Sequence, residues 1–219
     1  MDKKIALRDL AKKRKLTTPP EGSYQIGHFH NGLFDCEHVS PYSKGAHDFN
    51  APIFVLLQDW ASYFDTTKRK VKDVDIQLGY DPDQPTNKHL SDLLHSNFKR
   101  GISDVYGTNI YPFIKEKRPI TLEELMSAAK EFAIPEILIV KPKLVICLGL
   151  DTFNALRKAR GLNEVNNITE GLHNPFKIEN INVWLQAHTG NLGRYNRTKK
   201  NANQVEEDWK YMAEMFKGI

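Results

Sequence analysis

Two short and uninterrupted apolar runs, at residues 53–57 and 144–148, constrain the fold of this chain more than any other feature of its sequence. Continuous apolar runs of this length are typical of parallel strands that helices cover on both faces. Residues 105–111 and 183–187 are interpreted as two further strands. Segments with helical periodicity lie between these strands, and this alternation predicts an α/β fold with a largely parallel sheet.

Four helices are predicted from apolar residues at helical spacing and from local capping signals. They cover residues 88–97, 121–132, 152–160 and 204–217. Thr121 and Glu124 form a capping-box pair at the start of the second helix, and Gly161 is a natural end for the third. The methionines and aromatic residues of the last helix indicate a face buried in the core.

The chain has 219 residues, which suits one domain with a full core, and we assign this domain to residues 21–219. Residues 1–20 are rich in lysine and arginine, and we interpret them as a basic N-terminal arm or a short helix. The net charge of +4 is compatible with nucleic acid as a partner.

Several classes of protein are excluded by composition. No apolar run approaches the roughly 18–20 residues of a membrane helix, and the first 15 residues contain no apolar signal core. We therefore expect a cytoplasmic protein without a membrane partner. The two cysteines, Cys36 and Cys147, are too few for a disulfide framework or for the four thiolates of an iron–sulfur cluster. No metal and no cofactor are expected.

Polar residues mark the places where the predicted strands end. Gln58 and Asp59 follow the first strand, Asn109 lies in the second and His188 follows the fourth. Ligands of parallel α/β sheets bind beyond the carboxyl ends of the strands, so we expect these side chains to lie together. The simpler alternatives are a turn-capping role for Asn109 and a structural role for His188.

A carboxylate, an amide and an imidazole without a serine or cysteine nucleophile indicate chemistry that uses water. Asp59 could orient water or stabilise a cation, and His188 could donate to a developing anion. Asn109 could pair with a planar amide edge. Basic side chains follow His188, including Arg194, Arg197, Lys199 and Lys200. This mixture suits phosphate contacts, and a solvated loop is the alternative.

Four segments in order resemble the uracil-DNA glycosylase superfamily over roughly residues 50–200. LQDWA resembles the family motif GQDPY in its Gln58-Asp59 pair, and HTGNL resembles HPSPL in His188 and Leu192. TNIYPF is similar to a TN-containing strand of other branches, where the asparagine recognises the base. KPKLVICLG is similar to the stretch that those branches carry before their last pair of helices.

The resemblance implies a three-layer α/β/α sandwich with a central four-stranded parallel sheet. It implies a monomeric, monofunctional DNA glycosylase that flips uracil or a related damaged base out of DNA and hydrolyses its N-glycosidic bond. Asp59 and His188 would be catalytic, and Asn109 would bind the base together with Gln58 and Trp60. The residues that would contact DNA are Ser62, Gly190, Leu192, Arg194 and Arg197, with Leu192 as a wedge in the base stack.

The chain departs from the family motif at several positions. Leu57 replaces the motif glycine, and Trp60-Ala61 replaces Pro-Tyr, so the tyrosine that screens out the methyl group of thymine is missing. Trp60 is the alternative wall of the pocket. The aromatic residue that would stack on the base is left open between Tyr63, Phe64 and Tyr80.

Three other functions compete with this interpretation. A non-catalytic member of the same fold would bind DNA or a protein, and another member of that fold would bind or hydrolyse small nucleotides. A zinc site is the third alternative, because four histidine and cysteine side chains that could bind zinc lie close in sequence, although their spacing matches no familiar zinc motif. These are His28, His30, Cys36 and His38.

Overall fold

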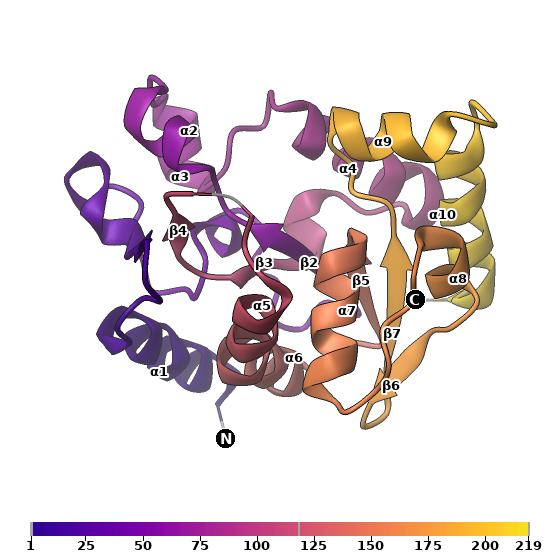
Figure 1. The fold of residues 1–219 in the computed structure, drawn as a ribbon, viewed down its shortest axis with the longest axis horizontal. Helices are drawn as coiled ribbons and strands as arrows, with labels where there is room; N and C mark the ends of the chain where they lie inside the picture. The colour runs from indigo at the N-terminus through magenta and orange to yellow at the C-terminus, as the bar shows by residue number, and fades with distance from the viewer. Residues whose placement is uncertain (1, 118, 219) are drawn as a thin grey trace.

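The computed structural model of the protein describes residues 2–117 and 119–218. A five-stranded sheet forms its centre (Figure 1). The strands, in spatial order, are β3 (Tyr106–Tyr111), β2 (Ile53–Asp59), β5 (Leu144–Leu148), β7 (Ile181–Gln186) and β6 (Phe176–Ile178). The first four run parallel, which confirms the predicted parallel sheet, and β6 runs antiparallel to β7. The edge strand β6 was not predicted, because three residues are too few to show an alternating pattern.

Helices pack on both faces of this sheet, so the predicted three-layer sandwich is confirmed. One apolar cluster joins the sheet to α1 (Lys3–Leu16), α5 (Leu122–Ala128), α6 (Ile134–Val140) and α7 (Leu150–Ala159). A second cluster joins the opposite face to η3 (Pro41–Lys44), α4 (Pro85–Phe98), α8 (Ile168–Leu172) and α10 (Gln204–Met215).

The predicted helices are confirmed as α4, α5, α7 and α10, with ends that differ by a few residues. Thr121 and Glu124 form the expected capping box at the start of α5. This helix does not end near residue 132 as predicted. It continues through a π-helical turn, Ala129–Ala133, into α6, and Pro135 lies in the first turn of α6. Proline removes a backbone donor, which accounts for the irregular turn before it.

Residues 3–16 form the helix α1. Of the two interpretations of the basic N-terminal segment, a flexible arm or a short helix, the structure therefore shows the helix. Leu7 and Leu10 are buried in the first apolar cluster. Arg14 is only 1% exposed, and its guanidinium donates to the side chains of Gln25 and Asp35. Helix α1 therefore packs on the rest of the protein, while the division near residue 20 stays a prediction.

Short elements surround the carboxyl ends of β2 and β3. They are β1 (Ser23–Tyr24), η1 (Ile26–His28), η2 (His30–Gly32), α2 (Tyr63–Lys68), α3 (Asp73–Leu78) and β4 (Ile114–Lys115). Strands β1 and β4 pair with each other, and a third apolar cluster holds Phe29 and Phe34 against Trp60. The remaining elements are η4 (Ile102–Asp104) before β3 and α9 (Asn191–Thr198) after β7. None of the described helices is long and apolar enough to span a membrane.

Strand β3 is held from both faces, and this fixes the directions of its side chains. On one face Thr108 donates to the fully buried carboxyl group of Glu136, whose pKa is raised by burial to about 8. On the other face the hydroxyl of Ser43 in η3 donates to the carbonyl oxygen of Gly107 at 2.7 Å. Side chains alternate along a strand, so Asn109 points to the same face as Gly107 and lies on the η3 side.

Candidate active site

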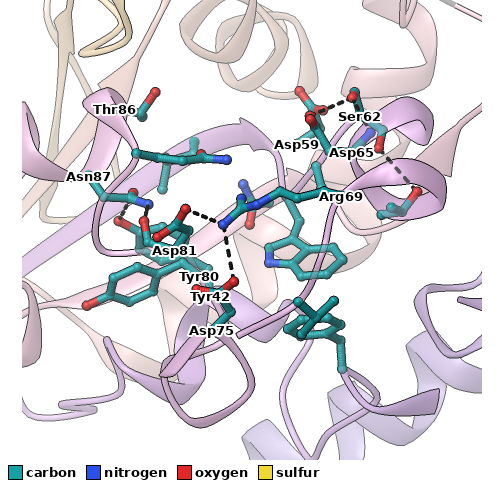
Figure 2. Close-up of a pocket in the computed structure, with 18 of the residues that line it drawn as sticks. Tyr42, Asp59, Ser62, Asp65, Arg69, Asp75, Tyr80, Asp81, Thr86 and Asn87 are labelled. Carbon is teal, nitrogen blue, oxygen red and sulfur yellow. Dashed lines mark hydrogen bonds and ion pairs between the residues drawn. The ribbon is translucent and has the colours of Figure 1, made fainter. Parts of the chain in front are cut away.

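A cavity of about 310 Å³ opens beyond the carboxyl ends of β2 and β3 (Figure 2). Asp59, Asn109 and His188 all line this cavity. Asp59 ends β2, Asn109 lies opposite Leu57 in the neighbouring strand β3, and His188 follows β7. The sheet therefore brings together three residues that are far apart in the sequence, as their positions at strand ends predicted.

Asn109 presents an unpaired amide donor. The residue is 1% exposed, and its Oδ1 accepts a hydrogen bond from the Ser40 hydroxyl at 2.6 Å. Its Nδ2 is buried without a hydrogen-bond partner. A buried donor that lacks an acceptor costs about 1–3 kcal/mol, which a ligand with a carbonyl oxygen would offset. The cavity is therefore suited to a ligand that accepts a hydrogen bond.

His188 is held as a neutral donor. Its Nδ1 lies 3.0 Å from the backbone N–H of Gly190 and accepts from it. In the neutral ring the proton is then on Nε2, which can donate. Burial lowers the pKa of His188, and the nearby charge of Asp59 opposes this shift. The imidazole is therefore uncharged at neutral pH. The effect of the Asp59 charge on this pKa indicates that the two side chains lie near each other.

Two glycines form the turn that carries His188. A Cβ atom at Gly190 would lie 2.9 Å from the His188 Nδ1 and 3.0 Å from the Thr86 Oγ1. A Cβ atom at Gly193 would lie 2.3 Å from the carbonyl oxygen of His188. A side chain at either position would force the turn that carries His188 to shift. Gly190, predicted as a DNA contact, has this packing role in the structure.

Ser62, also predicted as a DNA contact, lines the cavity and caps α2. Its hydroxyl accepts from the backbone N–H of Asp65 at 3.1 Å and donates to the Asp65 carboxylate at 2.6 Å. Such N-caps stabilise a helix by about 1 kcal/mol. The chain therefore turns directly into α2 behind Asp59, which fixes the exit from β2.

Aromatic rings form one wall of the cavity. The Trp60 indole N–H donates to the carbonyl oxygen of Gly79 at 2.6 Å, and its ring lies 4.8 Å from that of Phe34. Tyr80 stacks on Tyr42, with ring centroids 4.7 Å apart. These four rings all line the cavity.

Of the three candidates for a base-stacking aromatic, only Tyr80 is among the residues that line the described cavity. Tyr63 packs between Tyr24 and Phe29, and Phe64 is 70% exposed. Tyr80 is therefore the candidate that the structure leaves for stacking on a ligand.

A charged cluster that the sequence analysis missed completes the lining. Arg69 pairs with the carboxylates of Asp75 and Asp81, and all three residues line the cavity (Figure 2). The side chains of Asp75 and Asp81 are 6% and 9% exposed. The signal in the sequence was a short basic run at residues 69–72 followed by four aspartates within residues 73–83, a segment that contains one short helix, α3, and has no simple period.

Comparison with known families agrees with this architecture. A family model described as the uracil DNA glycosylase superfamily matches residues 69–213, which is more than half of the chain. The chain belongs to the uracil-DNA glycosylase superfamily. A comparison with curated proteins finds no match. The predicted resemblance is thus confirmed, although the matched range begins after Asp59.

The segment LQDWA, which resembles the family motif GQDPY, lies before the matched range and contributes to the cavity wall. Trp60 lines the cavity where the family motif has proline, and Ala61 lines it where the motif has tyrosine. Gln58, predicted as a base-binding residue, is partly buried and is not among the residues that line this cavity. Leu57 replaces the motif glycine and forms part of the cavity wall.

The other predicted DNA contacts of this superfamily member lie outside the cavity, on α9. Leu192 is 73% exposed. Arg194 pairs with Glu206 at 2.8 Å, and Arg197 forms two hydrogen bonds to Asp208, at 2.6 and 2.9 Å. A second groove, which is lined by Arg197 and by the lysines that follow it, reaches His188 from this side.

The residues of the alternative zinc site are not brought together into a ligand set. Within residues 2–117 and 119–218, no group of three or more His, Cys, Asp or Glu side chains could hold a metal ion. His30 lines the cavity and packs on Phe34, while Cys36 is a free thiol whose pKa is raised by burial.

Proposed function

We propose that this protein is a monofunctional DNA glycosylase that takes uracil or a related damaged base from DNA and hydrolyses its N-glycosidic bond. One observation carries the proposal: Asp59, Asn109 and His188 line a single cavity, and the buried Asn109 Nδ2 has no partner in the protein. Flipping a base into such a cavity costs a few kcal/mol, which contacts with the base offset. Monomeric state and cytoplasmic location stay predictions.

The three side chains have complementary roles in this reaction. As the bond between the sugar C1′ and the base nitrogen breaks, its electron pair leaves with the base and the sugar becomes cationic. The Asp59 carboxylate stabilises this cation and orients the water that adds to C1′. The His188 Nε2–H donates to a carbonyl oxygen of the departing base anion, where a preorganised donor contributes roughly 3–4 kcal/mol.

Binding of the base uses the remaining walls of the cavity. The Asn109 Nδ2 donates to a carbonyl oxygen of the base, and Tyr80 offers a ring face for stacking. Aromatic stacking on a base contributes about 1–3 kcal/mol. The water oxygen becomes the new hydroxyl on C1′ and gives up one proton, and the base anion gains one proton, so the products are the neutral free base and an abasic sugar.

The test is excision from single- and double-stranded DNA with one uracil, followed by alkaline cleavage of abasic sites. We expect wild type to cut at the uracil. His188→Ala should lower the rate by about 10²–10³-fold, because it removes a donor to the developing anion. Asp59→Asn should also lose excision, because an amide cannot stabilise the cation. His95→Ala, an exposed histidine on α4, is the matched control and should keep the wild-type rate.

Two outcomes would contradict the proposal. If folded wild type leaves uracil intact and a panel of other damaged bases is also untouched, the protein is a binding member of this superfamily. If His188→Ala and His95→Ala excise equally fast, the imidazole at the cavity has no catalytic role.

A further inference from the structure

The hydroxyl of Ser40 makes two hydrogen bonds in a fully buried position. It caps η3 by accepting from the backbone N–H of Tyr42 at 3.2 Å, and it donates to the Asn109 Oδ1 at 2.6 Å. A serine hydroxyl has a single proton. That proton is used on Asn109, 69 positions further along the chain.

The contact decides which end of the Asn109 amide is bonded to the protein and which end is left for a ligand. Asn109 lines the cavity, and with its Oδ1 bonded to Ser40 its buried Nδ2, a donor, is left without a hydrogen-bond partner. If the amide turned over, its NH₂ group would face the Ser40 oxygen, and the buried hydroxyl proton would lose its acceptor. A buried donor without an acceptor is strongly disfavoured. Ser40 therefore favours one of two orientations that are otherwise similar in shape.

We propose that Ser40 is a positioning residue that sets the base preference of the cavity through Asn109. The inference rests on the proposed function and extends it to the choice between bases. Uracil and cytosine differ where one has a carbonyl oxygen and the other an amino group. A fixed Nδ2 donor pairs with the carbonyl and meets a second donor in the amino group. With the hydroxyl present, the cavity takes uracil and rejects cytosine.

The neighbouring Ser43 supplies a matched control. It belongs to the same turn, η3, is also fully buried, and donates to the same strand through the carbonyl oxygen of Gly107 at 2.7 Å. Ser43→Ala removes a buried hydrogen bond of the same kind without touching Asn109. A merely structural effect would thus appear in both serine variants, whereas an effect on base preference belongs to Ser40.

The experiment measures binding rather than cleavage. Single-stranded DNA with one 2′-fluoro-2′-deoxyuridine competes with the same strand containing 2′-fluoro-2′-deoxycytidine, since the fluorine suppresses the cationic sugar and so prevents excision. We expect wild type and Ser43→Ala to prefer the uracil strand. In Ser40→Ala, this preference should fall by about tenfold or more, because both amide orientations become accessible. Ser40→Cys, which keeps a weak donor, should give an intermediate preference.

Each result has one meaning. An unchanged preference in Ser40→Ala and Ser40→Cys, or an equal loss in Ser43→Ala, overturns the role of Ser40. Equal binding of both strands by wild type overturns it as well. If wild type prefers the uracil strand through Ser40 but leaves natural uracil DNA uncut, the role of Ser40 stands and the proposed hydrolysis fails.

Discussion

The ring of His188 links protonation to catalysis at the scale of a single residue. Burial keeps its pKa below the ordinary value of about 6.5, and its Nδ1 is occupied by the Gly190 N–H. If Nδ1 were protonated, its N–H would face the N–H of Gly190, and the hydrogen bond that holds the ring would be lost. The neutral form prevails above the lowered pKa, so we expect a constant excision rate from pH 8 down to about 6.5. The rate should fall only below that pH, by about tenfold per unit.

A profile of kcat/KM against pH on uracil DNA checks this expectation. The His188→Ala variant is the control, because its residual rate should lose the acidic limb that belongs to the imidazole. An acidic limb that begins well above pH 6.5 in wild type would contradict a buried, neutral His188. So would a limb of the same position and depth in the variant.

At the scale of elements, the positions of the strands could be predicted from the sequence, but the contacts between turns and strands could not. The run at residues 144–148 corresponds to β5 without any shift, because a strand buried on both faces shows itself as an uninterrupted apolar run. The contact between Ser40 and Asn109 has no such signal, since it joins a turn to a strand far along the chain. The meeting of Asp59, Asn109 and His188 at one cavity was predictable, because sheet topology alone brings strand ends together.

The turn at Gly79 offers a test of how tightly these elements meet. Gly79 has a φ of +74° and ends α3, and a Cβ atom there would lie 1.8 Å from the carbonyl oxygen of Pro41 in η3. We expect Gly79→Ala to lower the free energy of unfolding by about 3 kcal/mol, from the left-handed backbone and from the clash together. Gly22→Ala isolates the backbone effect, because Gly22 has a φ of +67° and no atom within 4 Å of a Cβ.

Urea unfolding of both alanine variants measures the difference. The Gly22→Ala variant should lose only about 1 kcal/mol. Equal losses at the two positions would mean that η3 does not press on Gly79. Because the Gly79 carbonyl oxygen accepts from the Trp60 indole, a large loss should also weaken uracil-DNA binding.

At the scale of the whole molecule, the sequence does not reveal which basic side chains are available to bind DNA. Arg194, Arg197 and the two lysines after them look alike in a linear pattern, and all suit phosphate contacts. In the structure Arg197 is committed to Asp208, whose side chain is 6% exposed, whereas the Lys199 ammonium group lies over the Tyr195 ring at the surface. Tertiary partners decide which charges remain available to DNA, and spacing does not reveal those partners.

This distinction predicts opposite phenotypes for neighbouring basic residues. Among the described residues, Arg197→Ala leaves the buried Asp208 carboxylate with only the Gln204 amide as a hydrogen-bond donor, so it should lower the free energy of unfolding by about 3 kcal/mol. Its effect on the salt dependence of DNA binding should be small, because the charge is already neutralised.

Changing Lys199 and Lys200 together to alanine should leave the melting temperature unchanged. It should reduce the slope of log K against log salt by about 1–2, since phosphate contacts release counterions. Titrations of uracil DNA at several salt concentrations, together with melting curves, distinguish the Arg197→Ala variant from the double lysine variant. A reduced slope with an unchanged melting temperature in Arg197→Ala would contradict the structural role of Arg197.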